Sequence, residues 1–222
     1  MSETIGPGAR TRVRRLPKKA SYDKDVVYAI LDEAWVCHVA ANVAGQPTAL
    51  PTLHLREKDT IYLHGSPSNQ VLTSVLREGQ AFVTVTIFDG LRLARSGFES
   101  SIAYRSVVAV GAAREVDDAP EKSRVLERFV DRVLAGRASE VREMSEREQK
   151  LTLVVAVSID EAAAKISAGP TEDDEDDQAL PIWAGTVPAR LVFDEPVADP
   201  HGAMASGQIE VPASVRRLLE GQ

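Results

Sequence analysis

Short β-type segments joined by very short links constrain the fold of this chain most strongly. Three such segments cover residues 35–41, 48–55 and 60–64, and only a turn at Gly45 and the polar run 57–59 separate them. Parallel strands need a crossover of about a dozen or more residues, which these links do not provide. The spacing therefore predicts an antiparallel meander rather than a strand–helix–strand unit.

Further β-type segments, rich in β-branched and apolar residues, follow at 81–88, 102–116 and 151–159. The dipeptide Asp89-Gly90 is a strong signal for a two-residue hairpin turn, because such a turn needs positive φ at both positions. Residues 91–94 would then form the returning strand. Gly111 lies inside a predicted strand and indicates either a bulge or a close approach of another backbone.

Helical periodicity predicts four helices. The first ends near Glu33, and the second runs from Gln70 to Arg77. The third runs from Asp117 or Asp118 to about Leu134, and the fourth covers residues 213–219. The count of about seven strands, mostly sequential neighbours, predicts a mainly β fold. We expect a single antiparallel barrel with helices packed outside it.

A strand meets a helix within residues 61–69, Ile-Tyr-Leu-His-Gly-Ser-Pro-Ser-Asn. The first backbone N–H groups of a helix have no partner in the helix, and the helix dipole makes this end positive. The corner could therefore hold a phosphate. The alternative is that Ser66, Ser68 and Asn69 only cap the helix.

Histidines are the only side chains in the sequence that suggest proton transfer. His54 and His64 lie at or near the ends of neighbouring predicted strands, so they could flank one pocket. His38 lies within the first predicted strand and is interpreted as a satisfied sheet residue. None of these has Cys, Asp or Glu neighbours at metal-ligand spacing, so a zinc site is not expected.

Arg105 lies in an apolar strand sequence, Ala-Tyr-Arg-Ser-Val. A buried guanidinium group without a partner is costly. Arg105 is therefore expected either to pair with a carboxylate or to face an anionic ligand. Arg92 and Arg95 are alternative anion contacts, although their alternation with apolar residues also suits a solvent-facing role.

The composition is that of a soluble globular protein. The chain has 222 residues, 44% hydrophobic and 27% charged, with a formal charge of −7, so nucleic acid is an unlikely partner. The basic segment 10–19 suggests either a solvated leader that pairs with acidic groups of the same chain or an arm for a partner. The acidic run 172–177 is expected to be a mobile solvated loop.

The sequence predicts three segments: a basic arm at residues 1–20, a barrel domain at 21–195, and a tail with a short helix at 196–222. Cys37 is the single cysteine, and its apolar neighbours indicate a buried structural thiol. The chain shows no secretory signal and no membrane-spanning apolar run, so a cytoplasmic location is expected.

Several sequence blocks, in their order and spacing, resemble the pyridoxamine 5′-phosphate oxidase-like flavoproteins, and most closely the branch that includes the nitroimidazole-resistance proteins. The blocks span roughly residues 10–195 and include Arg12–Pro17, Tyr62–Ser66, Asp89–Leu91, Tyr104–Val108 and Pro181–Gly185. The resemblance implies a six- to seven-stranded antiparallel split β-barrel with flanking helices. It also implies a homodimer that binds FMN where the two subunits meet, and an oxidoreductase activity on a small-molecule substrate.

The resemblance also implies which residues contact the cofactor. Thr52 and Leu53 would run beside the flavin. The phosphate end would be lined by His64, Gly65, Ser66 and Asn69. Polar contacts from another strand would come from Tyr104, Arg105 and Ser106, and Trp183 would lie near the dimer interface.

Four positions, at three places along the chain, differ from the family pattern. Relatives carry Arg where this chain has Asn69, a His pair at Glu99 and Ser100, and a basic residue near Ser167. Each charge-assisted contact to a phosphate contributes roughly 1.5–3 kcal/mol, so the loss of two would weaken FMN binding by about 10²-fold or more. These differences favour an alternative: a dimeric split-barrel protein that carries another cofactor, a deazaflavin or haem, without turnover.

Overall fold

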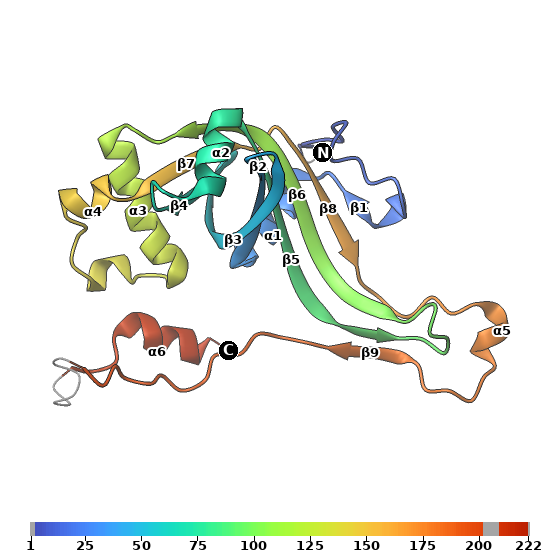
Figure 1. The fold of residues 1–222 in the computed structure, drawn as a ribbon. Helices are drawn as coiled ribbons and strands as arrows, with labels where there is room; N and C mark the ends of the chain where they lie inside the picture. The colour runs from blue at the N-terminus through green and yellow to red at the C-terminus, as the bar shows by residue number, and fades with distance from the viewer. Residues whose placement is uncertain (1–2, 202–208, 222) are drawn as a thin grey trace. The chain divides into compact units, whose positions relative to one another are not determined.

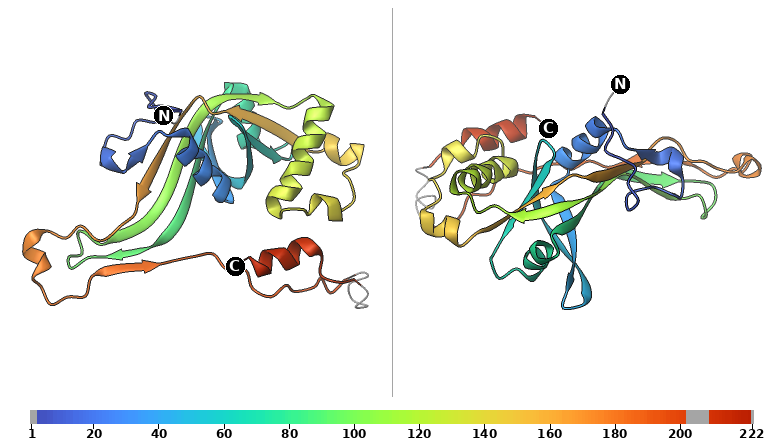
Figure 2. Two further views of the ribbon diagram at one scale, coloured as in Figure 1. Left: turned by 180° about the vertical axis from the view of Figure 1, so that it is seen from behind. Right: turned by 90° about the horizontal axis from the view of Figure 1, so that it is seen from above.

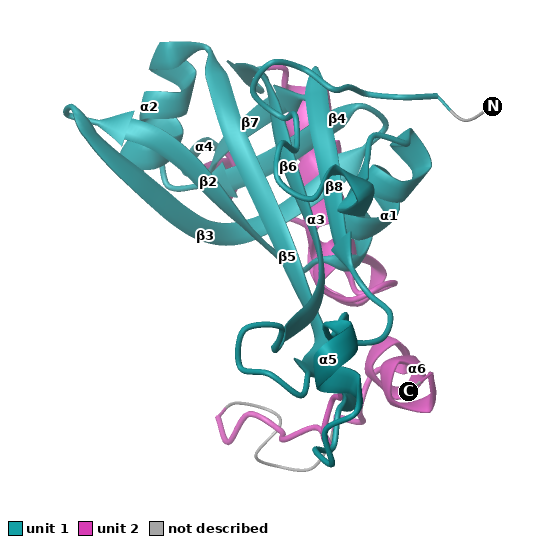
Figure 3. Ribbon diagram, turned by 90° about the vertical axis from the view of Figure 1, so that its right-hand side faces the viewer, with its two compact units in different colours: residues 1–117, 150–190 teal, residues 118–149, 191–222 magenta. Residues whose placement is uncertain are grey.

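The structure is a computed structural model that describes residues 3–201 and 209–221. The chain forms two compact units (Figure 3). The first combines Met1–Asp117 with Lys150–Arg190, and the second combines Asp118–Gln149 with Leu191–Gln222. The predicted segments 1–20, 21–195 and 196–222 stay a prediction, because a compact unit is defined by contacts and not by independent folding.

Six antiparallel strands of the first unit close into a ring (Figure 1). Their order around the ring is β6–β7–β4–β3–β2–β5, and β5 pairs back onto β6. The strands are β2 (Val36–Val43), β3 (Gln46–Glu57), β4 (Thr60–Gly65), β5 (Gln80–Leu93), β6 (Ser101–Glu115) and β7 (Leu153–Ser158). The predicted mainly β fold, an antiparallel split barrel, is confirmed.

Three further strands extend the sheet beyond the ring: β1 (Ala20–Ser21), β8 (Glu161–Ser167) and β9 (Gly185–Pro188). One edge of β6 is shared, because residues 104–110 pair with β8 and residues 113–115 pair with β7. Gly111 lies at this change of partner. A Cβ there would overlap the carbonyl oxygen of Ser158, so Gly111 allows a close backbone approach.

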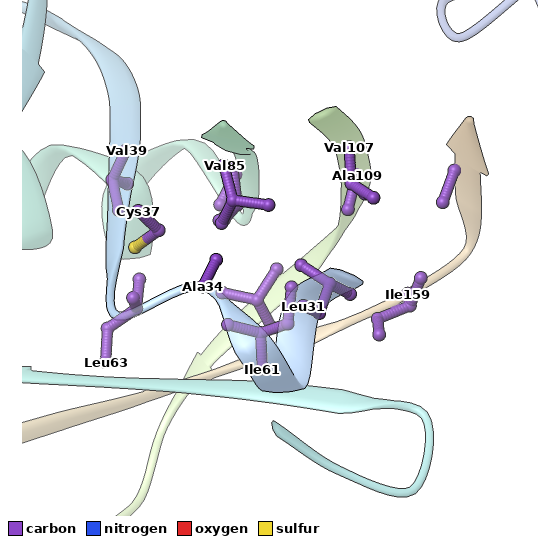
Figure 4. Packing of buried hydrophobic residues seen from close by; sticks show 14 of the residues in the cluster. Leu31, Ala34, Cys37, Val39, Ile61, Leu63, Val85, Val107, Ala109 and Ile159 are labelled. Atoms are coloured by element: carbon purple, nitrogen blue, oxygen red, sulfur yellow. The ribbon is translucent and has the colours of Figure 1, made fainter. Parts of the chain in front are cut away.

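The barrel interior is filled by alternate residues of each strand, as Figure 4 shows. In β2, Cys37 and Val39 point into this core, whereas Val36, His38 and Ala40 are exposed on the outer face. The prediction that Cys37 is buried is confirmed. His38 is a residue of the sheet, as predicted, and the period of two directs its side chain to the outer face.

Two amphipathic helices of the first unit contribute to the same core. Helix α1 (Lys24–Glu33) begins after Asp23, which caps it, and buries Val27, Ile30 and Leu31 at helical spacing. Helix α2 (Gln70–Glu78) buries Val71, Leu72 and Val75 and packs mainly against β2. Both helices agree with the sequence prediction.

The Asp89-Gly90 hairpin prediction is wrong. Strand β5 continues through these residues with a bulge between Phe88 and Gly90, and the connection to β6 lies at residues 94–100. Gly90 has φ +146°, and a side chain there would collide with the backbone of Val187 in β9. Pairing with β9 therefore replaces the turn. The part of β5 that follows residue 88, the part of β6 that pairs with it, and β9 form an extension of the sheet that we call the arm (Figures 1 and 2).

The N-terminal leader is attached to the barrel. Ile5 N donates to the carbonyl of Tyr22, and Arg10 forms an ion pair with Glu161 at 2.7 Å. Lys18, within a short 3-10 helix, η1 (Pro17–Lys19), pairs with Glu172. The interpretation of the leader as a segment that pairs with acidic groups of the same chain is confirmed for these two side chains.

The acidic run is more ordered than predicted. The Asp173 side chain is almost fully buried, where it accepts from the backbone N–H of Arg95 at 2.6 Å and pairs with the Arg95 guanidinium at 2.9 Å. A short helix, α5 (Glu175–Gln178), follows. The prediction of a mobile solvated loop is therefore wrong at Asp173, because a buried ion pair fixes it.

The second unit is helical. It contains α3 (Ala119–Val133, capped by Asp118), the 3-10 helix η2 (Ala138–Glu140), α4 (Glu146–Lys150) and α6 (Ala213–Glu220). The Glu140 carboxylate accepts from the backbone N–H and the hydroxyl of Ser214, which attaches α6 to η2. None of the helices that the structure describes is long and apolar enough to cross a membrane.

Candidate functional site

The corner between β4 and α2 satisfies its own donors. The side-chain oxygen of Asn69 accepts from Val71 N at 3.0 Å and from Leu72 N at 3.1 Å. The Ser66 hydroxyl accepts from Ser68 N at 3.2 Å. The capping interpretation is confirmed for Asn69, whereas Ser66 and Ser68 bond to each other. A phosphate at this corner would have to displace the Asn69 side chain from the first turn of the helix.

His54 and His64 do not share a pocket. His54 is fully buried, and its Nε2 lies 2.8 Å from the carbonyl oxygen of Leu31. It pairs with Leu63, whose side chain is also in the core, so His64 points to the opposite face of the sheet. Burial lowers the pKa of His64, which keeps its imidazole neutral near pH 7. The hypothesis of one pocket flanked by both rings is wrong.

Leu53 and His64 come together on the outer face. The pairing of β3 with β4 ends at His54 and Leu63. If this register is continued by one step, it sets Leu53 against His64 at the point where the two strands separate. Thr52 lies opposite the buried Cys37 and therefore faces the core. Of the two residues predicted beside a flavin, only Leu53 lies on the outer face.

Arg105 is occupied by carboxylates. Its guanidinium donates to both oxygens of Asp89, at 2.7 and 2.9 Å, and pairs with Glu33 at the end of α1. These hydrogen bonds raise the pKa of Arg105. Of the two alternatives that the sequence left open for this residue, the structure shows the carboxylate partner.

The remaining predicted contacts lie away from the corner within one chain. Tyr104 and Ser106 are half-buried on β6, where they pair with β5 and β8, whereas the corner lies at the end of β4, which pairs with β3 and β7. Trp183 lies in the arm next to Gly185 and is 66% exposed. A single chain therefore does not bring the whole predicted set together.

A buried arginine lies beside Ser167, where the family pattern has a basic residue. Arg92 of β5 donates from Nη1 to the Ser167 hydroxyl at 3.2 Å and also donates to the carbonyl of Pro170. Arg92 is 5% exposed, so the solvent-facing interpretation is wrong. A guanidinium from another strand thus supplies the positive charge at this position.

The outer face of β2, β5 and β6 carries exposed apolar side chains. Val36, Phe82, Phe88 and Val108 lie on it, with exposed fractions of 38–49%. Sequence reasoning did not single out Phe82, although the buried Ala81 and Val83 on either side direct it outward. Within the part of the chain that the structure describes, no group of three or more His, Cys, Asp and Glu could hold a metal ion.

The chain is similar to solved structures over nearly its whole length. The flavocytochrome Anf3 from Azotobacter vinelandii is 33% identical, with 97% of this chain and 98% of that chain covered and a TM-score of 0.89. The FAD and haem binding protein from Mycobacterium smegmatis is also 33% identical, with 90% and 97% covered and a TM-score of 0.84.

A more distant structure shares the fold. It is described as a 5-nitroimidazole antibiotic resistance protein from Bacteroides thetaiotaomicron and is 22% identical, with 66% of this chain and 86% of that chain covered and a TM-score of 0.57. No curated protein matches the sequence. The family model of pyridoxamine 5′-phosphate oxidase matches residues 23–166, which is more than half of the chain. The protein therefore belongs to the pyridoxamine 5′-phosphate oxidase family, as its sequence blocks predicted.

Proposed function

We propose that this protein is a redox protein that binds FAD together with haem. One observation carries the proposal: similarity at 33% identity extends over 97% and 90% of the chain to a flavocytochrome and to a protein named for binding FAD and haem. The more distant relative covers only 66% of the chain. The family model matches residues 23–166. The similarity to these two relatives therefore extends to segments of the chain outside that range.

The β4–α2 corner supports FAD over FMN. Asn69 already satisfies the donors at Val71 and Leu72, and Ser66 satisfies Ser68. A flavin that depended on this corner for its only phosphate would compete with these hydrogen bonds. A dinucleotide has a second nucleotide half through which binding energy is gained, so it depends less on one phosphate contact.

The chain offers two imidazoles that fit a haem ligand. His38 is exposed on the outer face of β2 between Val36 and Ala40, and His64 is half-buried on the same face with a lowered pKa that keeps it neutral. Neutral imidazole is a common axial ligand of haem iron. His54 fits less well, because its Nε2 lies against the carbonyl of Leu31.

Each cofactor would supply its own chemistry, hydride or single-electron transfer by flavin and single-electron or oxygen chemistry by haem. The protein would orient and shield both. Leu53 would exclude water from the ring system, and His64 would stay uncharged near neutral pH.

A homodimer is part of the proposal. Large exposed apolar patches on a sheet face mark interaction sites. Tyr104 and Ser106 lie on β6 and Trp183 lies next to β9, and neither strand pairs with β4, whereas a second chain packed on the outer face could supply such groups beside His64. This distribution supports a cofactor at the subunit interface.

Absorbance and cofactor extraction of the purified protein test the proposal. We expect flavin and haem bands in the visible spectrum and FAD, not FMN, released on denaturation. FMN alone would instead support the FMN oxidoreductase that the sequence predicts. A colourless protein whose melting temperature does not change with FAD, FMN or haemin would contradict both.

Two single variants identify the haem ligand. His38→Ala and His64→Ala each leave three other histidines in place. The variant that loses the haem band while it retains flavin identifies the ligand. Retention of haem by both variants would exclude both imidazoles.

A further inference from the structure

A groove opens on the outer face near the turn that joins β2 to β3. We call it the β2–β5 groove and define its floor by Ala40, Ala49 and Phe82. Ala40 is the Cα partner of both Ala49 and Phe82, so the phenyl ring stands next to two methyl groups. The resulting hollow has a volume of about 420 Å³. Its shape suits a flat apolar group against the ring.

Phe82 is supported from its other side. The guanidinium of Arg10 lies over the ring, 5.7 Å from its centre, and is bound to Glu161 of β8 and to Gln80. Arg10 thus connects β8 to Gln80 on the β5 side of the groove, whereas the opposite side is lined by β2 and β3. The cation stabilises the ring and leaves the β2–β3 side open.

The rim of the groove carries groups that recognise a purine edge. Asn42, Gln80 and Glu78 line it. The oxygen of the Gln80 amide accepts from Arg10 at 3.0 Å, which directs its NH₂ group away from Arg10. Amide side chains match the donor and acceptor pattern of adenine. The Glu78 carboxylate attracts an exocyclic amino group and repels phosphate, so it favours a base at this end of the groove.

The groove lies in line with the predicted flavin position. Ala49 and Leu53 are on the same strand and the same face, four residues apart, which corresponds to roughly 13 Å. FAD differs from FMN by an added adenosine monophosphate, and that added part needs a second contact site. We propose that the β2–β5 groove binds the adenine of FAD by stacking on Phe82. This inference rests on the proposed function, since it takes FAD as the cofactor.

Affinity measurements on the full-length chain test the inference. Flavin fluorescence and calorimetry would give dissociation constants for FAD, FMN and AMP. Phe82→Ala should weaken FAD by about tenfold, the typical effect of losing one base–aromatic stack, and leave FMN unchanged. Ala49→Leu fills the groove without removing the ring and should weaken FAD in the same way.

Phe98→Ala is the matched control. Phe98 is an exposed phenylalanine in the connection between β5 and β6, outside the groove, so this variant should bind FAD as the wild type does. Unchanged FAD affinity in both groove variants would overturn the inference, and so would equal losses of FAD and FMN. Both results would leave the proposal that the protein binds a flavin unchanged.

AMP separates the inference from the proposed function. If the wild type binds no flavin, the proposed function fails. AMP binding that is lost in Phe82→Ala would then still support a purine site in the groove. Absence of AMP binding in that case would overturn the inference as well.

Discussion

Arg105 is the residue at which α1 and the arm are joined. Its guanidinium binds Asp89 in the β5 bulge and Glu33 at the last turn of α1. Two carboxylates from distant parts of the chain are therefore held around one cation. Such a partly exposed network contributes less than a buried one, because solvent screens it.

Arg105→Ala should lower the free energy of unfolding by about 1–2 kcal/mol, since it leaves Asp89 and Glu33 facing each other without a cation. Urea denaturation measures this loss. Arg105→Lys should recover only part of it, because lysine lacks the planar fork that binds both carboxylates. A variant of unchanged stability with weaker flavin binding would instead return Arg105 to the role of an anion contact, the alternative that the sequence left open.

His64 should make stability depend on pH. Burial lowers its pKa in the folded state, so between that pKa and the ordinary value of about 6.5 the unfolded chain binds more protons. Stability should therefore fall as pH drops from 7 through this window. His64→Gln should reduce the slope of stability against pH there, as measured by urea denaturation at pH 5 to 8. An identical slope in the variant would assign the dependence to another group.

The sequence could identify Arg105 as a cation that needs a partner, but not which partner. Asp89 is 16 residues away and Glu33 is 72 residues away. Only the packing of α1 against the barrel decides that both carboxylates reach it. Likewise, the helix cap at Asn69 is a local pattern and was predictable, whereas the arrangement of Leu53 with His64 depends on strand register.

At the scale of secondary structure elements, the shared edge of β6 depends on Gly111. Gly111→Ala should destabilise the protein by about 3 kcal/mol or more, because the added methyl group would overlap the backbone of Ser158. Gly97→Ala is the control, since a Cβ at Gly97 meets no atom within 4 Å. Its effect on the free energy of unfolding should stay within about 0.5 kcal/mol. Equal melting temperatures for the two variants would contradict the close approach.

Two elements were not predictable from local sequence. Strand β8 contains Glu161-Ala-Ala-Ala-Lys165, a composition that favours a helix, yet Ala162 and Ala164 are buried against the barrel. Asp89-Gly90 favours a turn, yet β9 pairs with β5 there. In both cases pairing between distant segments overrides local preference. The strands β2, β3, β4 and β6 were predicted at nearly their observed positions, and β5 was predicted correctly up to Phe88.

For the whole molecule, the dimer proposal makes a direct prediction. Val108 lies on the outer face of β6 opposite Thr84 and is 40% exposed. Val108→Asp would place a charge without a partner in the proposed interface and should convert a two-chain particle into a single chain. Light scattering after size-exclusion chromatography measures the mass.

Val133→Asp is the matched control, because Val133 is an exposed residue of α3 in the second unit. It should leave the mass at two chains. A two-chain mass for Val108→Asp would move the interface to another face. A single-chain mass for the wild type would remove the dimer from the proposed function.

The closure of the ring by β7 has a consequence for synthesis on the ribosome. Strand β4 ends at Gly65, but its partner on one edge, β7, begins at Leu153, 153 − 65 = 88 positions later. At 5–20 residues per second, that edge stays open for roughly 4–18 s of translation. During this interval the nascent chain presents one unpaired edge of β4, a strand with two core residues, Ile61 and Leu63, which favours association with other chains. The barrel can close only after 158 of the 222 residues have been made.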